Sequence, residues 1–227
     1  QRKARPSVWR DVADGFQYLW HWKGMLMALM LATLINMTIH PGMSLLPILV
    51  QNHFEGGALQ LGWMNSAWGI GMIAGGLVLS AWGGFSKKIR TMTLGGVGFG
   101  LAILAWGILR GDLFGAAVLS GALLGLAIPL VDGPMMALLQ GAIAPEMQGR
   151  VFSLFGSLIW ITSPLGLSMA GPISDWLGLQ VWYLVAGVLG IAAASVFLFV
   201  PAARNIEENA NGGAEKVEQV ELVPAEA

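Results

Sequence analysis

Two ionisable side chains stand inside otherwise apolar stretches of this chain, and each is followed directly by glycine and proline. His40 begins the run HPG, and Asp132 begins the run DGP. Ionisable groups in hydrocarbon are costly, and they mark ion pathways and proton relays. We interpret Asp132 and His40 as candidates for binding a coupling proton or cation. The alternatives are a structural carboxylate with satisfied hydrogen bonds for Asp132 and a hydrogen bond near a helix break for His40.

Other polar and soft side chains share helical spacing with these two residues. Asn36, His40 and Ser44 follow i, i+4, i+8, and so do Asp132, Met136 and Gln140, which puts each set on one helical stripe. Met and aromatic side chains fill adaptable apolar pockets, although they more often only fill cores. For isolated Ser and Thr we expect hydrogen bonds between helices. The substrate-cavity candidates are Asn36, Ser44, Asn65, Trp68, Met72, Met136, Gln140 and Trp160.

The composition is that of an integral membrane protein. Of 227 residues, 56% are hydrophobic and 11% charged, against about 25% charged in a soluble domain. The net charge of −1 gives no reason to expect a nucleic-acid partner. The absence of cysteine excludes disulfides and thiolate metal sites, and we expect neither a metal nor a cofactor. An enzyme is not expected, because Asp132 has no second membrane carboxylate beside it and no G-x-S-x-G occurs.

Six segments are long and apolar enough to cross a bilayer. All Lys and Arg except Arg110 then fall on one side, so the positive-inside rule places both ends in the cytoplasm. Residues 1–24 are predicted as a cytoplasmic linker with an amphipathic interfacial helix, and residues 201–227 as a disordered acidic tail. We expect an aromatic belt at the outer surface from Trp63, Trp106, Trp176 and Trp182. The predicted spans are 25–50, 59–82, 91–109, 113–141, 151–174 and 180–200.

The chain contains an internal repeat. The pattern G-x3-[SD]-x2-G occurs at Gly76, Ser80 and Gly83, and again 95 residues later at Gly171. HPG and DGP, at which we expect breaks in the first and fourth spans, are 92 residues apart. Three helices separate the copies, so the second copy runs through the membrane upside down, as in secondary transporters. The predicted fold class is an all-α membrane protein with six transmembrane helices built as two inverted three-helix repeats.

Two segments resemble loop motifs of the major facilitator superfamily, in the C-terminal six-helix half of its twelve-helix fold. "GGLVLSAWGGFSKKIR" is similar to the cytoplasmic loop between helices 8 and 9, with Ser80 where an acidic residue is usual. "LLQGAIAPEMQGRVFSLFG" is similar to the segment joining helices 10 and 11. The matching positions, which are candidates for cytoplasmic gating loops, are Gly76, Gly83, Lys87, Lys88, Glu146, Gly149 and Arg150.

The resemblance is strongest to macrolide-efflux-like and enterobactin-exporter-like drug:proton antiporters. It implies proton-coupled efflux of amphiphilic small molecules, such as macrolide-like drugs or siderophores, by alternating access in a bacterial inner membrane. It also implies salt bridges from Lys87 and Arg150 that hold the outward-facing state, where the alternative is positive-inside topology alone. The expected partners are the lipid bilayer, a small-molecule substrate and an N-terminal six-helix half upstream. The alternatives are metabolite uptake, facilitated diffusion or a non-transporting truncated scaffold.

Overall fold

The computed structural model of the protein describes residues 23–143 and 145–199. Within these ranges the chain is helical apart from short connections, and it has no β-strand. The predicted interfacial helix and acidic tail lie outside the described residues. The elements are α2 (Lys23–Asn52), α3 (Ala58–Trp82), α4 (Lys88–Ile108), the 3₁₀ turn η1 (Gly111–Leu113), α5 (Phe114–Ala142), α6 (Pro145–Leu177) and α7 (Leu179–Phe199).

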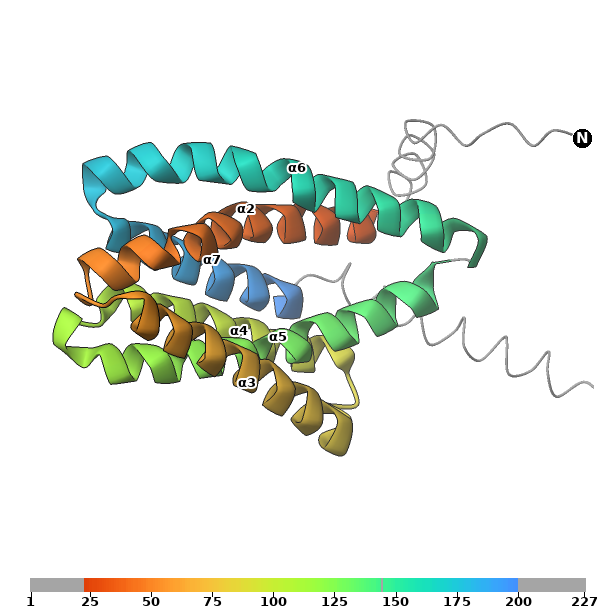
Figure 1. Ribbon diagram of the computed structural model, residues 1–227. Helices are drawn as coiled ribbons and strands as arrows, with labels where there is room; N and C mark the ends of the chain where they lie inside the picture. The colour runs from red at the N-terminus through yellow and green to blue at the C-terminus, as the bar shows by residue number, and fades with distance from the viewer. Residues whose placement is uncertain (1–22, 144, 200–227) are drawn as a thin grey trace, which may run out of the picture.

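The helices form a bundle in which α4 and α7 are the central pair. The α4 helix packs on both α5 and α7, and α3 packs on α5. On the other side, α2 packs on α6 and α7. Figure 1 shows the result: α2 and α6 run along one side, α3, α4 and α5 along the other, and α7 lies between.

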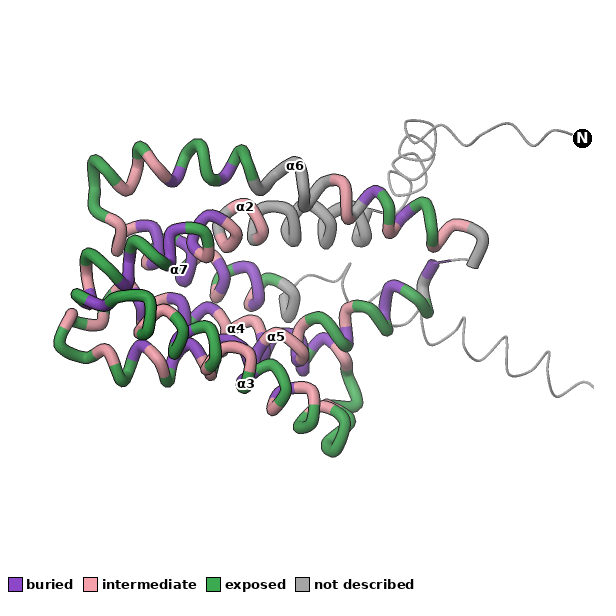
Figure 2. The backbone as a smooth tube through the Cα atoms, viewed as in Figure 1, coloured by how far each residue is buried: buried purple, intermediate pink, exposed green. Residues whose placement is uncertain are grey.

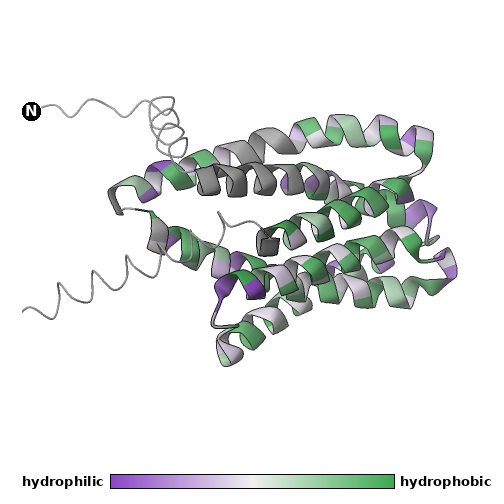
Figure 3. Ribbon diagram, turned by 180° about the vertical axis from the view of Figure 1, so that it is seen from behind, coloured by the Kyte–Doolittle hydropathy of each residue, from purple (hydrophilic) through white to green (hydrophobic). Residues whose placement is uncertain are grey.

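Four stretches are long and apolar enough to cross a membrane: Ala58–Trp82, Lys88–Ile108, Gly111–Gly141 and Leu179–Val196. Strongly hydrophilic residues gather at helix ends and connections (Figure 3). The predicted spans 25–50 and 151–174, which correspond to α2 and α6, stay predictions.

The expected helix breaks at HPG and DGP are absent. The α2 helix continues through Pro41 and Pro47, and α5 continues through Pro129 and Pro134. Proline removes one backbone N–H from the helical ladder, and neighbouring helices compensate for this loss in a bundle. Pro41 and Pro134 are both buried against such neighbours. Prediction of a break was therefore wrong at both positions.

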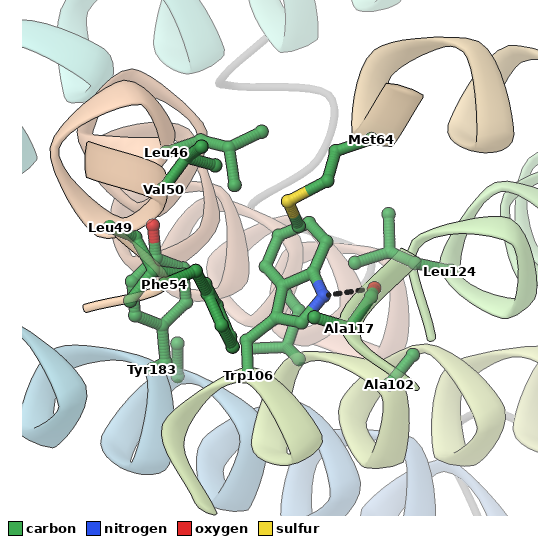
Figure 4. Packing of buried hydrophobic residues seen from close by; sticks show 12 residues of the cluster. Leu46, Leu49, Val50, Phe54, Met64, Ala102, Trp106, Ala117, Leu124 and Tyr183 are labelled. Carbon is green, nitrogen blue, oxygen red and sulfur yellow. Dashed lines mark hydrogen bonds between the residues drawn. The ribbon is translucent and has the colours of Figure 1, made fainter. Parts of the chain in front are cut away.

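The main core lies where α2, α3, α4, α5 and α7 meet (Figure 2). At its centre, Trp106 is 1% exposed and donates its indole N–H to the carbonyl oxygen of Ala117 at 3.0 Å (Figure 4). Tyr183 packs edge-on against this ring and donates its hydroxyl to the Gly42 carbonyl at 2.7 Å. Trp182 is also buried. Trp106 and Trp182 therefore belong to the protein interior, and the expected assignment of both to an aromatic belt was wrong.

Glycines bring helix backbones into direct contact. A Cβ added at Gly71 or Gly75 of α3 would collide with backbone atoms of α5, and one at Gly125 of α5 would collide with α3. On the other side of the bundle, a Cβ at Gly166 of α6 would collide with the carbonyl oxygen of Met37 in α2. Such close approach is how small residues hold membrane helices together. The small-xxx-small run at Gly71 and Gly75 is a packing motif, as its spacing indicates.

Three serine and threonine hydroxyls in the described helices bond to their own backbone, whereas we expected bonds across helices. Thr93, Ser120 and Ser195 each donate to a carbonyl three or four residues earlier, at 2.8 to 3.0 Å. This local bond is always within reach of a short hydroxyl side chain, so it satisfies the group without a partner helix. Glycine-lined backbone contacts join α3 to α5 and α6 to α2.

Candidate substrate and coupling site

The polar stripe of α5 lies on the face of the helix that its neighbours leave open. Asp132, Met136 and Gln140 are all exposed, and the Met136 side chain is 50% exposed. Pro134 and Leu138, on the other side of the same turns, are buried. The stripe therefore points away from α3 and α4, the helices on which α5 packs.

The stripe of α2 is less open. Asn36 and His40 are partly buried, whereas Ser44 is exposed. The Ser44 hydroxyl donates to the carbonyl oxygen of His40 at 3.1 Å, so its own helix satisfies it. In the described part of the chain, no hydrogen bond or ion pair joins His40 to Asp132, and α2 packs mainly on α6 and α7 whereas α5 packs on α3 and α4. The structure does not bring the two ionisable candidates together.

The substrate-cavity candidates in α3 lie in two different environments. Asn65 and Met72 are exposed, whereas Trp68 is partly buried and packs against the core. The indole N–H of Trp68 is enclosed and has no acceptor among the described residues. Trp68 thus contributes to helix packing in this arrangement. The side chain of Trp160, the remaining aromatic candidate, lies outside the described residues.

The connection between α3 and α4 has a defined conformation. Gly83 ends α3 in the left-handed region, with φ 75°, and its N–H donates to the Leu79 carbonyl at 2.8 Å. Only glycine adopts this conformation without strain, which explains its place in the motif. Gly76, one turn earlier than Ser80, faces open space. Lys87 is exposed and Lys88 partly exposed at the start of α4.

The connection between α5 and α6 is held by a glutamine. The Gln148 side-chain amide donates to the carbonyls of Gln140 and Ile143, at 2.9 and 3.1 Å. It thereby ties the end of α5 to the first turn of α6. Gly149 and Arg150 follow and are exposed.

Of the predicted gating salt bridges, the structure gives a result for Lys87 alone. Lys87 makes no ion pair with any described residue, and the side chain of Glu146 lies outside the described part. A guanidinium nitrogen of Arg150 lies 4.0 Å from the Met147 sulfur. The gating role of Lys87 and Arg150 stays a prediction.

Sequence reasoning missed a polar cluster at the opposite end of the bundle. The His53 Nε2 lies 2.7 Å from the Leu109 carbonyl oxygen, and its Nδ1 lies 2.7 Å from the Gln180 amide nitrogen. These distances fit a neutral ring that donates from Nε2 and accepts at Nδ1. The cluster joins the ends of α2 and α4 to the start of α7. The sequence gives an indication of this cluster, because His53 and Gln180 are polar residues at the ends of predicted spans, although they are 127 residues apart.

A cavity of about 380 Å³ lies beside this cluster. Its walls include Leu45 and Ile48 of α2, Asp175 of α6 and Gln180 of α7. It is separate from the α5 stripe.

Comparison with known proteins identifies the family. The family model described as Major Facilitator Superfamily matches residues 24–224. The chain belongs to the Major Facilitator Superfamily. This confirms the resemblance drawn from the two loop motifs. Together with its apolar helices, membership makes the chain an integral membrane protein of a transporter family, which suggests a non-enzymatic role.

Several curated relatives are efflux proteins by name. Macrolide efflux protein A of Streptococcus pyogenes is 30% identical over 89% of this chain and 50% of the relative. The protein of the same name from Enterococcus faecalis is 32% identical over 71% of the chain and 50% of the relative. Multidrug efflux pump Tap of Mycolicibacterium fortuitum is 24% identical over 88% of the chain and 48% of the relative. The chain therefore spans about half the length of these relatives. No solved structure matches it.

Proposed function

We propose that this chain is the C-terminal six-helix half of a secondary active transporter that exports amphiphilic small molecules in exchange for protons. All six long helices cross a bacterial cell membrane, and both ends of the segment face the cytoplasm. An N-terminal half supplies the second wall of the central cavity, and alternating access follows from rocking of one half against the other. Asp132 binds the coupling proton or cation.

The proposed inverted repeat is supported by the pattern of helix contacts. If α2, α3 and α4 correspond to α5, α6 and α7, the contact of α3 with α5 corresponds to that of α6 with α2, and the contact of α4 with α5 to that of α7 with α2. Every one of these pairs is in contact. The central pair, α4 with α7, corresponds to itself. These matching pairs are what an in-plane two-fold axis would produce, and they support the proposed repeat, although the smaller contacts of α2 with α3 and of α6 with α7 have no counterpart as extensive.

Pairs of glycines 95 residues apart also support the proposed correspondence of the two three-helix units. Gly71 and Gly166 each make a backbone contact that excludes a Cβ, the first with α5 and the second with α2. Gly83 and Gly178 each lie in the left-handed region, with φ 75° and 90°. Each donates its N–H to the carbonyl four residues earlier, at 2.8 and 3.0 Å. These shared roles support the proposed correspondence of the two units.

The observation that carries the functional proposal is the exposure of Asp132 on a strongly apolar helix. A carboxyl group facing lipid at mid-membrane costs about 2.5–3.5 kcal/mol by insertion scales. An open carboxyl group on this face therefore requires a watered cavity or a second protein wall. Relatives of twice the length supply room for such a wall. Their printed names support efflux as the direction of transport.

The test is proton-driven transport by the full-length protein with Asp132→Asn, measured in everted membrane vesicles with an imposed pH gradient. We expect the variant to lose accumulation driven by the gradient, because the amide cannot carry a proton. Asp112→Asn is the matched control, since Asp112 is exposed in the connection after α4 and pairs with Arg110 at 3.5 Å. Unchanged transport and pH dependence in Asp132→Asn would remove Asp132 from the mechanism. Accumulation in right-side-out vesicles instead would replace efflux with uptake.

A further inference from the structure

We propose that the connection between α3 and α4, together with the first turn of α4, binds the headgroup of an anionic phospholipid. We call residues 82–90 the α3–α4 loop. The inference rests on the proposed span arrangement, which places this loop at the cytoplasmic surface of the bilayer. It does not depend on the direction of transport or on the role of Asp132.

Two large aromatic rings are displayed at the end of α3. Trp82 is 44% exposed and Phe85 is 43% exposed. Their ring centroids are 4.7 Å apart and the planes meet at 81°, so each ring supports the other at the surface. Aromatic rings exposed in this way at a helix end fit the interfacial layer of a membrane, where one edge is apolar and the other is wet.

Positive charge stands directly beside the rings. Lys87 and Arg90 are exposed, and neither has a carboxylate partner among the described residues. No acidic residue lies between Trp82 and Arg90. Figure 3 shows this start of α4 as a strongly hydrophilic segment next to apolar helix surface. Unpaired cations beside exposed aromatics are complementary to a lipid with a phosphate headgroup and acyl chains.

The loop is already held in the conformation that presents these groups. Gly83 and Gly84 both have positive φ, 75° and 79°. The backbone N–H of Phe85 donates to the hydroxyl oxygen of Thr91 at 2.9 Å, and Thr91 is only 1% exposed. A Cβ on Gly84 would lie 2.8 Å from the same hydroxyl oxygen, so the turn closes tightly on α4. Because the loop is preorganised, binding requires little ordering of the backbone.

A second possible occupant is the acidic segment 205–227, which carries six glutamates and one lysine. Charge alone would suit either occupant. The exposed rings favour the lipid, because a polar acidic segment offers little apolar surface to cover Trp82 and Phe85.

The experiment measures how many phosphatidylglycerol and phosphatidylcholine molecules stay bound to the purified full chain, by native mass spectrometry from mixed micelles with equal amounts of both lipids. We expect a preference for phosphatidylglycerol that falls about five-fold with Arg90→Gln, and about as much with Lys87→Gln, the effect of one charge near an anionic surface. Trp82→Ala should also weaken binding, which distinguishes a lipid from a free phosphate ion.

Two matched controls lie at the other end of the bundle. Arg110→Gln removes an exposed arginine, and Trp176→Ala removes a tryptophan that is 89% exposed. Both should leave the lipid preference unchanged. An equal loss in Arg110→Gln and Arg90→Gln would overturn the proposal, because the effect would then be one of net charge. A rise in phosphatidylglycerol binding when Glu207, Glu208, Glu215 and Glu218 become glutamine would assign the loop to the acidic segment instead. Neither result would alter the outcome expected for Asp132→Asn.

Discussion

Two adjacent glycines of α3 allow the contact between α3 and α5 to be tested against an internal control. Gly75 faces α5, and an added Cβ would lie 2.9 Å from the carbonyl carbon and Cα of Leu126. Gly76 faces open space, with nothing within 4 Å of its added Cβ. Both lie inside the same helix, so replacing either with alanine gains the same helix propensity, about 1 kcal/mol. Any difference between the two variants therefore reports the contact itself.

The size of the difference follows from the contact distance. Carbon atoms prefer separations of about 3.5–4.0 Å, so Gly75→Ala must push the two backbones apart by roughly 0.6–1.1 Å. Overpacking of this kind costs about 1–3 kcal/mol. For a chain of this length, that difference corresponds to about 2–12 °C in the midpoint of thermal unfolding. We expect Gly75→Ala to unfold at the lower temperature and Gly76→Ala at or above the wild-type midpoint.

The chain has no cysteine, so thiol-reactive dyes cannot report its unfolding. A suitable assay heats detergent-solubilised protein in steps and measures the remaining monodisperse fraction by fluorescence-detected size-exclusion chromatography. Equal midpoints for Gly75→Ala and Gly76→Ala would refute the close approach of α3 and α5. A drop in both would point to a general intolerance of side chains on this helix.

Three further outcomes test other parts of the fold. Trp106→Phe should lower the free energy of unfolding by about 0.5–1.5 kcal/mol, since it removes one buried hydrogen bond while the Ala117 carbonyl keeps the one from Ser120; an unchanged midpoint would contradict the hydrogen bond. Gly83→Ala should cost about 1–2 kcal/mol because of its φ of 75°, and a stabilised variant would show that α3 does not end there in the left-handed region. His53→Ala and Gln180→Ala should be non-additive in a double-mutant cycle of thermal unfolding, with a coupling of about 0.5–1.5 kcal/mol, whereas strict additivity would exclude their contact.

The sequence was informative where one physical requirement acts alone. The spacing of Asp132, Met136 and Gln140 places them on one face in any helix, and the structure leaves that face open. Gly83 ends its helix because only glycine takes up the left-handed conformation readily. In both cases local backbone geometry decides the outcome, so the sequence alone is sufficient to predict it.

Prediction from the sequence failed where contacts with neighbouring helices determine the local structure. Nothing within HPG reveals that the surrounding helices would keep α2 continuous through Pro41. Trp106 stands near a span end, as a belt residue would, but its indole N–H finds an acceptor in α5 and the ring is buried. The contact of His53 with Gln180 joins residues 127 apart in the sequence, and no spacing rule connects them.

Pro41 of α2 and Gly166 of α6 lie directly against one another. Pro41 has no N–H, so the carbonyl oxygen of Met37, four residues earlier, loses its usual donor within the helix. Gly166 stands directly against this oxygen and also against the Pro41 ring. Its Cα hydrogens can approach the oxygen as weak donors, which a bulkier residue would prevent. The carbonyl that Pro41 deprives of its helical donor therefore lies where the backbone of α6 packs closely on α2, and a larger residue at position 166 would separate the two helices there.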